Sequence, residues 1–172
     1  MTNSETKICA PGGDYWPTPM AAVLPLLPFL PPRTRFFEPC AGNGALIDHL
    51  VANGHKRYWA CDIAPKRGDI ITHDAIEYAT SLQKIGCLDE VDFIITNPPY
   101  SESAMLRLLD CLPNFKPSWF LLQAGFVHNK YFAPLKPFLK SVASVGRIKW
   151  VEGSRHKSTK DYVWVYDFEV VT

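Results

Sequence analysis

The fold is decided by the stretch Arg35-Phe36-Phe37-Glu38-Pro39-Cys40-Ala41-Gly42-Asn43-Gly44, which leads into the run Ala45 to Ala52. Arg35 to Glu38 is short and apolar enough to predict a strand, and Gly42-Asn43-Gly44 predicts a turn. Ala45 to Ala52 predicts a helix, which Gly54 ends. The regular part of the chain therefore begins with a strand, a glycine-rich turn and a helix.

The same order of strand, turn and helix repeats downstream. The predicted strands are Arg57 to Asp62, Asp69 to Thr72, Val91 to Thr96 and Trp119 to Gln123, and the predicted helices are Ala75 to Gln83 and Ser101 to Leu112. Strands that alternate with helices predict an α/β protein with a doubly wound, mostly parallel sheet. In such a sheet ligands collect at the carboxyl ends of the strands, so the residues after Glu38, Asp62 and Thr96 should meet in space.

Both ends of the chain depart from this alternation. Upstream, four prolines between Pro25 and Pro32 break an apolar stretch into what we expect to be a short helix and an extended segment. Downstream, Ser144 to Val151 and Tyr162 to Val170 are strand-like and have no helix between them, which predicts an antiparallel hairpin. A length of 172 residues suits one domain.

Composition excludes several classes of protein. No apolar run reaches the roughly 18 residues that a membrane span needs, so we expect a soluble, intracellular protein with no membrane partner. The five cysteines are scattered and form no Cys-x-x-Cys pair, so neither a metal site nor a disulfide framework is indicated. The formal net charge is only +1, but basic residues crowd the last quarter: Arg147, Lys149, Arg155, Lys157 and Lys160. A local basic surface of this kind can meet phosphate.

The glycine turn after Glu38 is the first candidate binding site. Its glycines permit positive backbone φ angles and let a ligand approach the main chain closely. A dinucleotide-binding fingerprint would need Gly or Ala where Ile47 stands, and the Glu38 carboxylate would repel a pyrophosphate, so NAD is disfavoured. On its own, a Gly-x-Gly after a strand is also compatible with a plain tight turn.

Two aspartates follow the next predicted strands. Asp62 lies 20 residues after Gly42, where an acid accepts hydrogen bonds from ribose hydroxyls, although it could instead cap its strand or pair with Lys66. Asp74 could accept a hydrogen bond from an adenine amino group, or N-cap the helix that begins at Ala75. A cofactor with an adenosine, no phosphate and a cationic sulfonium that favours nearby acids is S-adenosylmethionine. We expect it to bind here.

Asn97-Pro98-Pro99-Tyr100, directly after the strand that ends at Thr96, is the second candidate site. The prolines fix the backbone and leave carbonyls free of any sheet ladder. The lone pair of an aromatic exocyclic amine is delocalised, so two acceptors for its hydrogens would push the nitrogen towards tetrahedral geometry; the Asn97 side-chain oxygen and the Pro98 carbonyl can supply them. Tyr100 offers a flat face on which a planar substrate can stack. A proline-rich turn that begins with Asn is the alternative without function.

Together, Glu38 to Gly44 and Asn97 to Tyr100 resemble the motifs of amino-group DNA methyltransferases. Asp14 to Pro19 is similar to the segment that precedes the first motif in many adenine methyltransferases, where the threonine contacts the methionine part of the cofactor. The resemblance implies a Rossmann-like methyltransferase fold and adenine N6 in DNA as the methyl acceptor. It implies catalytic roles for Asn97, Pro98, Pro99 and Tyr100, and S-adenosylmethionine contacts by Tyr15, Trp16, Thr18, Pro19, Glu38, Pro39, Cys40, Ala41, Gly42, Gly44, Asp62, Ile63, Asp74 and Asn97.

The resemblance covers nearly all of the chain and is to the catalytic core alone, as in compact phage-type or solitary methyltransferases. We therefore expect residues 1–172 to form a single catalytic domain without a separate target-recognition domain, in a cytoplasmic protein that can be phage-encoded and act in a bacterial host. The target adenine would flip out of a DNA duplex or come from a single strand. The candidates for nucleic-acid contact are Trp150, Arg155, His156, Lys157 and Lys160, for which a solvated hairpin tip is the alternative.

Other functions share part of this pattern. RNA adenine methylation is compatible with the same core, and the basic segment does not distinguish RNA from DNA. Methylation of a protein glutamine amide also uses Asn-Pro-Pro-Tyr, in a family that usually carries an additional N-terminal domain. Cytosine C5 methylation is disfavoured because Cys40 lies in the cofactor turn and not at the acceptor site. A catalytically silent nucleic-acid-binding or partner subunit is a further alternative, against which the intact acceptor motif argues.

Overall fold

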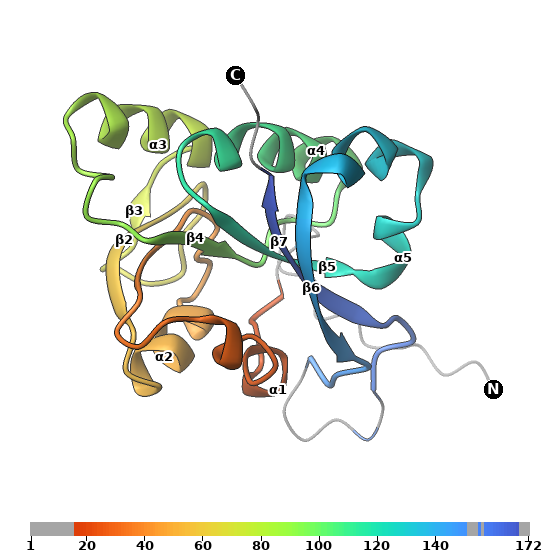
Figure 1. The fold of residues 1–172 in the computed structure, drawn as a ribbon. Coiled ribbons are helices and arrows are strands. Elements are labelled where there is room, and N and C mark those ends of the chain that lie inside the picture. Colours follow the sequence, from red (N-terminus) through yellow and green to blue (C-terminus); the bar gives the residue numbers. More distant parts are fainter. Residues whose placement is uncertain (1–15, 151–154, 156, 169–172) are drawn as a thin grey trace.

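The computed structural model describes residues 16–150, 155 and 157–168, and these build one seven-stranded sheet (Figure 1). The strands are β1 (Arg35–Glu38), β2 (Lys56–Asp62), β3 (Ile71–Thr72), β4 (Phe93–Thr96), β5 (Ser118–Gln123), β6 (Leu139–Gly146) and β7 (Tyr162–Phe168). Their order is β3-β2-β1-β4-β5-β7-β6, with β1 to β5 parallel and β7 antiparallel to both β5 and β6. The predicted mostly parallel sheet with an antiparallel C-terminal pair is confirmed.

Helices cover both faces of the sheet. The α-helices are α1 (Met20–Val23), α2 (Ala45–Ala52), α3 (Ala75–Lys84), α4 (Glu102–Cys111) and α5 (Ala124–Val127), and the 3-10 helices are η1 (Leu27–Phe29), η2 (Leu112–Asn114) and η3 (Lys130–Phe138). In the view of Figure 1, α1 and α2 lie below the sheet, and α3 and α4 lie above it. Among the described residues, no helix has the length and apolar character that crossing a membrane requires.

The core consists of two apolar layers, one on each face of the sheet. On β1, Phe36 packs in the layer that contains residues of α1 and α2, whereas its neighbour Phe37 packs in the layer that contains residues of α3 and α4. On β4, Ile95 and Ile94 divide in the same way. Successive side chains of a strand point to opposite faces, so a strand that is covered on both faces needs apolar residues throughout. This is why the central strands have uninterrupted apolar sequences.

The sheet has its topological switch point between β1 and β4. From β1 the chain moves outward to β2 and β3, then returns to β4 and moves outward on the other side. Open α/β sheets bind ligands outside the carboxyl ends of the strands at such a point. Glu38 ends β1 and Asn97 follows β4, so the two predicted motifs lie together at the switch point.

The prediction for the first C-terminal strand was wrong in its bounds. We expected it over residues 144–151, but β6 begins at Leu139 and ends at Gly146. Gly146 has a φ of 74°, a left-handed conformation in which the chain leaves the ladder, and residues 147–150 are in no strand. The antiparallel pairing with β7 is confirmed, from Leu139 opposite Phe168 to Gly146 opposite Tyr162. An apolar run predicts extended backbone, but it does not mark where pairing stops.

The predicted bounds of three other segments also differ from the structure or lie partly outside it. Only residues 71–72 of the predicted third strand pair with β2, and the segment that was expected to be extended before β1 contains the 3-10 helix η1. Pro28 is near the start of η1, where its missing N–H costs no hydrogen bond. The predicted end of β7, at residues 169–170, lies outside the described residues.

Trp164 of β7 connects the sheet to α1. Its indole nitrogen donates a 2.7 Å hydrogen bond to the carbonyl oxygen of Ala22, and the side chain is fully buried. Trp164→Phe would leave that carbonyl without its donor and open a small cavity, so we expect the free energy of unfolding to fall by about 2 kcal/mol in urea denaturation. Trp59→Phe is the matched control, because Trp59 is half-buried and donates to Cys87 at 3.2 Å. It should cost less, and equal losses would contradict this account of Trp164.

Candidate active site

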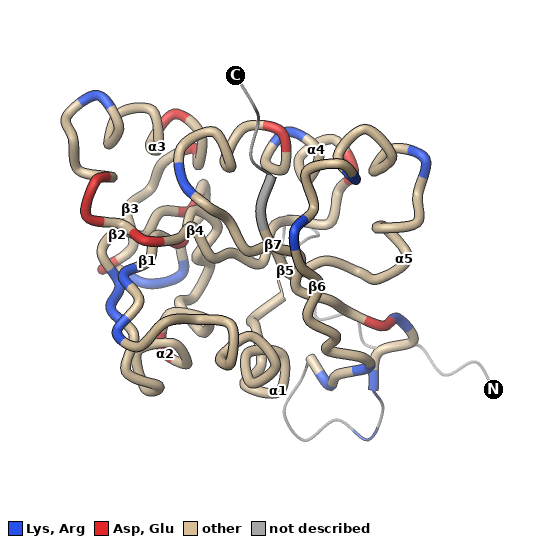
Figure 2. Tube along the Cα trace, viewed as in Figure 1, with Lys and Arg blue, Asp and Glu red and all other residues tan. Residues whose placement is uncertain are grey.

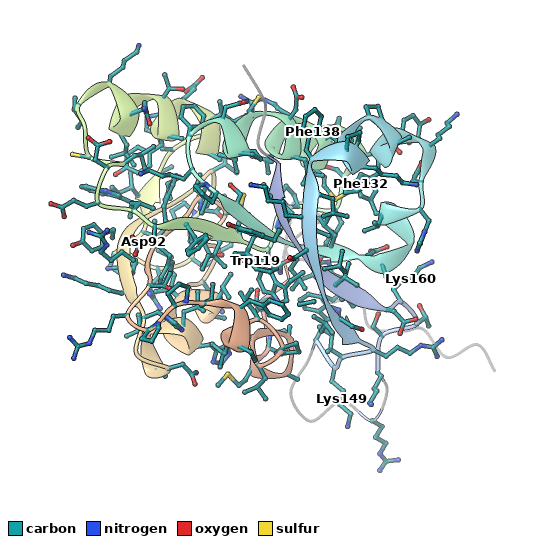
Figure 3. All side chains as sticks on the ribbon, in the orientation of Figure 1. Asp92, Trp119, Phe132, Phe138, Lys149 and Lys160 are labelled. Carbon is teal, nitrogen blue, oxygen red and sulfur yellow. The ribbon has the colours of Figure 1, made fainter. Side chains whose placement is uncertain are left out.

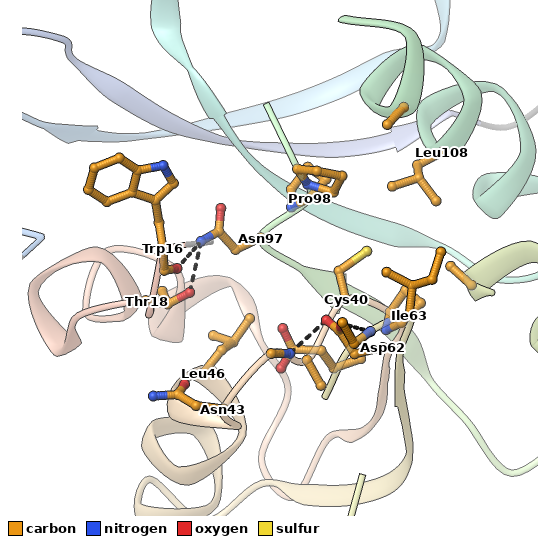
Figure 4. A pocket seen from close by; sticks show the side chains of 18 of the residues that line it. Trp16, Thr18, Cys40, Asn43, Leu46, Asp62, Ile63, Asn97, Pro98 and Leu108 are labelled. Atoms are coloured by element: carbon orange, nitrogen blue, oxygen red, sulfur yellow. Dashed lines mark hydrogen bonds between the residues drawn. The ribbon is translucent and has the colours of Figure 1, made fainter. Parts of the chain in front are cut away.

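A cavity of about 500 Å³ opens at the carboxyl ends of β1, β2 and β4 (Figure 4). Most of the residues that the sequence predicted for the site line it: Trp16, Thr18, Glu38, Pro39, Cys40, Ala41, Gly42, Asp62, Ile63, Asp74, Asn97, Pro98, Pro99 and Tyr100. Pro19 and Gly44 lie outside this lining, and Tyr15 lies outside the described residues. The cofactor and acceptor motifs are thus two walls of one cavity.

The turn after β1 is held by its glycines and by Asp62. Gly42 has a φ of 54°, and its backbone amide donates a 2.8 Å hydrogen bond to Oδ2 of Asp62. Gly44 has a φ of 80°, and a Cβ atom there would collide with the guanidinium group of Arg67. That guanidinium is fixed by ion pairs to Asp48 and Asp69. Gly44 therefore shapes the turn from behind the cavity wall.

Asp62 is oriented from two sides. In addition to the amide of Gly42, the amide of Ala64 donates to its Oδ1 at 2.8 Å. A carboxylate oxygen has two lone pairs, so each oxygen can accept a second hydrogen bond from a ligand hydroxyl. Ile63, the next residue, is 78% exposed and lines the cavity beside it. The end of β2 thus presents a fixed carboxylate next to an apolar surface.

Asp74 N-caps α3, which is one of the two roles that the sequence predicted for it. Its Oδ1 accepts from the backbone amides of Ile76 at 3.0 Å and Glu77 at 3.1 Å, and its Oδ2 accepts from Arg107 at 2.8 Å. The hydrogen bond from Arg107 is the largest influence on the pKa of Asp74 and lowers it, so the carboxylate is charged at neutral pH. A contact between Asp74 and an adenine amino group stays a prediction.

Several lining residues were not found from the sequence. On the acceptor side, Ser101, Ala104, Arg107 and Leu108 face the cavity from the start and body of α4. These residues are spaced three and four apart, so they share one face of the helix. Because that helix directly follows the Asn97 motif, the sequence could have indicated the face that continues from the motif. Lys66, in the loop after β2, and Asn43, in the glycine turn, also line the cavity.

Glu38 is a buried acid in the cavity wall. Its side chain is 1% exposed, and among the described residues its Oε2 has no hydrogen-bond partner. Burial, followed by the negative charge of Asp62, raises the pKa of Glu38 well above 4.5; the charge of Arg67 and the backbone amide of Asn97 oppose this rise. A buried carboxylate without a partner destabilises the protein unless a cationic group meets it. This wall is therefore suited to a positively charged part of a ligand.

Glu38→Gln should stabilise the ligand-free protein at neutral pH. Because the folded pKa of Glu38 lies above the unfolded value, the folded protein binds more protons, and the free energy of unfolding falls as the pH rises from about 4.5 towards the folded pKa. Gln does not ionise, so the variant should lose this part of the slope in urea denaturations between pH 4.5 and 8. Glu90→Gln, at an exposed position, is the control. A parental slope in Glu38→Gln would contradict the assignment.

Asn97 is held by hydrogen bonds to the N-terminal segment. Its Nδ2 donates to the carbonyl oxygen of Trp16 at 3.0 Å and to Oγ1 of Thr18 at 3.1 Å, which Figure 4 marks with dashed lines. Its Oδ1 accepts a 2.8 Å hydrogen bond from the hydroxyl of Tyr100. The acceptor motif and the segment at residues 16–18, which the sequence placed together only by resemblance, are thus in direct contact.

Cys40 is the cysteine of the cavity wall. Burial raises the pKa of its thiol, and the nearby charges of Asp62 and Glu38 act in the same direction. A thiol with a raised pKa is protonated at neutral pH and is a poor nucleophile. Within the described residues, no group of three His, Cys, Asp or Glu side chains could hold a metal ion.

An aromatic cluster lies behind the acceptor side of the cavity. Trp150 contacts the rings of Trp16, Tyr100 and Tyr162, with ring centroids 6.0, 6.4 and 5.0 Å away, and it does not itself line the cavity. Trp16 and Tyr100 do line the cavity. The nucleic-acid contact that the sequence suggested for Trp150 stays a prediction.

Lys and Arg positions gather where β6 and β7 meet the described parts of their connecting segment (Figure 2). Arg155, Lys157 and Lys160 are exposed, and Figure 3 shows Lys149 and Lys160 pointing outward; the nucleic-acid contact expected of Arg155, Lys157 and Lys160 stays a prediction. His156 lies outside the described residues. The described part of this segment is thus rich in exposed basic residues, with Asp161 paired to Arg147 at 3.6 Å.

No family model and no curated protein matches this sequence. Solved structures do. A modification subunit assigned to a type I restriction enzyme of Vibrio vulnificus YJ016 is 12% identical over 92% of this chain, with a TM-score of 0.60. Thermoplasma acidophilum protein 1320 is 14% identical over 87% of this chain and 89% of its own, with a TM-score of 0.51. A TehB-like SAM-dependent methyltransferase of Corynebacterium glutamicum is 15% identical over 92% and 90%, with a TM-score of 0.46.

The protein has a Rossmann-like methyltransferase fold. The mostly parallel seven-stranded sheet with its antiparallel β5-β7-β6 end carries this assignment together with the structural matches. At these identities the likeness concerns the fold alone. The chain spans 46% of the Vibrio vulnificus subunit, which is about half of its length.

Proposed function

We propose that this protein transfers a methyl group from S-adenosylmethionine to the exocyclic N6 amino group of adenine in nucleic acid, with DNA as the first candidate substrate. One observation carries the proposal: the buried carboxyl of Glu38, whose Oε2 has no hydrogen-bond partner among the described residues, and the fixed amide of Asn97 are walls of the same cavity. The first suits a cationic cofactor, and the second suits an amino group that donates hydrogen bonds. Both are needed for methyl transfer to nitrogen.

The lining residues fit S-adenosylmethionine. Oε2 of Glu38 is a free acceptor for an ammonium group, and acids near the cavity favour a sulfonium cation. Asp62 stands at the end of β2, where acids accept hydrogen bonds from ribose hydroxyls, and Ile63 and Leu108 offer apolar surface to an adenine ring. Bound in this cavity, the cofactor would supply an electrophilic methyl group.

The protein's own groups would prepare the acceptor nitrogen. Oδ1 of Asn97 can accept a second hydrogen bond besides that from Tyr100, and the Pro98 carbonyl supplies another acceptor. Two such bonds localise the lone pair on the nitrogen. The nitrogen then forms a bond to the methyl carbon as the carbon–sulfur bond breaks, the bonding pair stays on sulfur, and the nitrogen loses one proton to water. The aromatic rings of Trp16 and Tyr100 give a planar base surfaces to contact.

The choice of nucleic acid is supported by the surroundings of the site. Exposed Arg155, Lys157 and Lys160 lie in the segment between Trp150 and Tyr162, two rings of the aromatic cluster, and cations near aromatic rings suit phosphates and unstacked bases. The fold match at a TM-score of 0.60 is to a protein assigned as the modification subunit of a restriction enzyme, which is in keeping with DNA as the substrate. RNA meets the same chemical requirements.

The test incubates the protein with methyl-labelled S-adenosylmethionine and, in separate reactions, duplex DNA, single-stranded DNA, RNA and a protein extract. We expect label in N6-methyladenine from DNA. Label in RNA alone would overturn DNA as the substrate but retain adenine, and label in a protein glutamine would overturn both. No transfer in any reaction would overturn the proposed activity.

Two substitutions separate the halves of the site. Asn97→Ala should lower kcat by at least a hundredfold and leave the cofactor Kd within a few-fold of the parent, because Asn97 is assigned to the acceptor. Asp62→Ala should mainly weaken cofactor binding. Calorimetry with S-adenosylmethionine and single-turnover kinetics measure the two effects. If Asn97→Ala lost cofactor affinity and Asp62→Ala did not, the assignment of the two walls would be reversed.

The basic surface predicts a salt effect. Lys157→Ala should weaken nucleic-acid binding and reduce the slope of log Kobs against log salt concentration by about 1, since each lost phosphate contact releases one counterion fewer. Lys84→Ala, at the exposed C-terminal end of α3, is the charge-matched control and should keep the parental slope. Fluorescence anisotropy with a labelled oligonucleotide between 50 and 200 mM salt measures both, roughly the range in which such contacts are resolved. Equal slopes for the two variants would remove Lys157 from the interface.

A further inference from the structure

The side-chain amide of Asn97 has one allowed orientation. The carbonyl oxygen of Trp16, 3.0 Å from Nδ2, can only accept a hydrogen bond. Turning the amide over would place Oδ1 against this carbonyl, so that two acceptors would face each other and the partly buried carbonyl would lose its donor. In this orientation Oδ1 accepts a 2.8 Å hydrogen bond from the Tyr100 hydroxyl, which could donate or accept and therefore follows the orientation that the Trp16 carbonyl sets.

Thr18 supplies the other contact on the Nδ2 side. Its side chain is 4% exposed, and its Oγ1 accepts from Nδ2 at 3.1 Å across 79 residues of sequence. Its position is set by the core, because α1 begins two residues later, Ala22 and Val23 are fully buried, and Ala22 accepts the hydrogen bond of Trp164. The location of the Thr18 hydroxyl is therefore fixed by the fold before any ligand binds.

We infer that Thr18 is a positioning residue for Asn97: the Trp16 carbonyl sets the orientation of the amide, Thr18 holds the amide in that orientation, and the orientation sets which chemical edge of a substrate the site accepts. Thr18 and the Trp16 carbonyl hold both Nδ2 hydrogens, so Oδ1 is the atom of Asn97 that remains for the substrate. An acceptor oxygen binds an amino group and repels a carbonyl oxygen. The site therefore takes the amino edge of adenine or cytosine and rejects the carbonyl edge of guanine or thymine.

This inference rests on the proposed function and deepens it. It also differs from the role that resemblance implied for Thr18, a contact with the methionine part of the cofactor. The two roles have different consequences. A cofactor contact affects the cofactor Kd, whereas a positioning contact affects kcat and the Asn97 amide itself.

The experiment compares Thr18→Val, Thr18→Ser and Thr34→Val. Val has nearly the shape of Thr without its hydroxyl, and Ser keeps the hydroxyl. Thr34 is the matched control, because it is 1% exposed, its hydroxyl donates to the carbonyl of Pro31, and it precedes β1 at the end of that strand opposite the site. Each variant is examined for kcat with the oligonucleotide, for cofactor Kd by calorimetry, and by 15N NMR for the side-chain amide signals of Asn97.

For Thr18→Val we expect about a tenfold lower kcat and a cofactor Kd within about twofold of the parent, the effect of one lost hydrogen bond on the acceptor side. The Asn97 Nδ2 hydrogens should shift and exchange faster with water. Thr18→Ser should restore both readouts, and Thr34→Val should change neither. If Thr18→Val does not fold, Tyr100→Phe provides the test, because it removes the bond to Oδ1 and should also shift the Asn97 amide signals.

Each result has a distinct meaning. An unchanged kcat and amide signal in Thr18→Val, or a weaker cofactor Kd that accounts for the whole loss, would overturn the inference while leaving the proposed function in place. A parent protein that methylates no nucleic acid, with an Asn97 amide that still responds to Thr18→Val, would overturn the proposed function and retain the positioning of Asn97.

Discussion

Burial of the central strands on both faces is the constraint on which the rest of the structure depends. Phe36 and Phe37 are neighbours in β1, and both are fully buried because helices cover each side of the sheet. Parallel strands that are covered in this way need helical crossovers, which bring every strand into the sheet in the same direction. The segments that follow β1, β2 and β4 consequently meet at one edge. The cavity is a product of this arrangement.

One acid in the cavity wall lowers the stability of the ligand-free protein. Glu38 is buried without a full set of partners, and its raised pKa reflects that cost. Asp62 and Asp74, by contrast, are satisfied by backbone amides and by Arg107. The acid that is most costly to ionise is thus the one whose Oε2 has no hydrogen-bond partner among the described residues, and a cationic group beside it would lower that cost. Such local conflicts with stability are typical of functional sites.

The acceptor side depends on contacts between distant parts of the chain. Asn97 receives its orientation from residues 16–18, and this segment is fixed through α1 to Trp164 of β7. The first and last described elements of the chain thus jointly position a side chain from its middle. Tyr100 connects the same network to the aromatic cluster around Trp150.

The sequence by itself determined the fold class, the two motifs and their common edge of the sheet, because strand patterns, glycine turns and capping residues act over a few neighbouring residues. The N-cap interpretation of Asp74 is an example. The tertiary structure alone decided where β6 ends, that Arg107 pairs with Asp74 across 33 residues, and that Thr18 holds Asn97. It also decided that Trp150 packs against Trp16 and Tyr100 and lies outside the cavity lining. These features depend on how the layers pack, and packing brings together residues whose proximity no local pattern records.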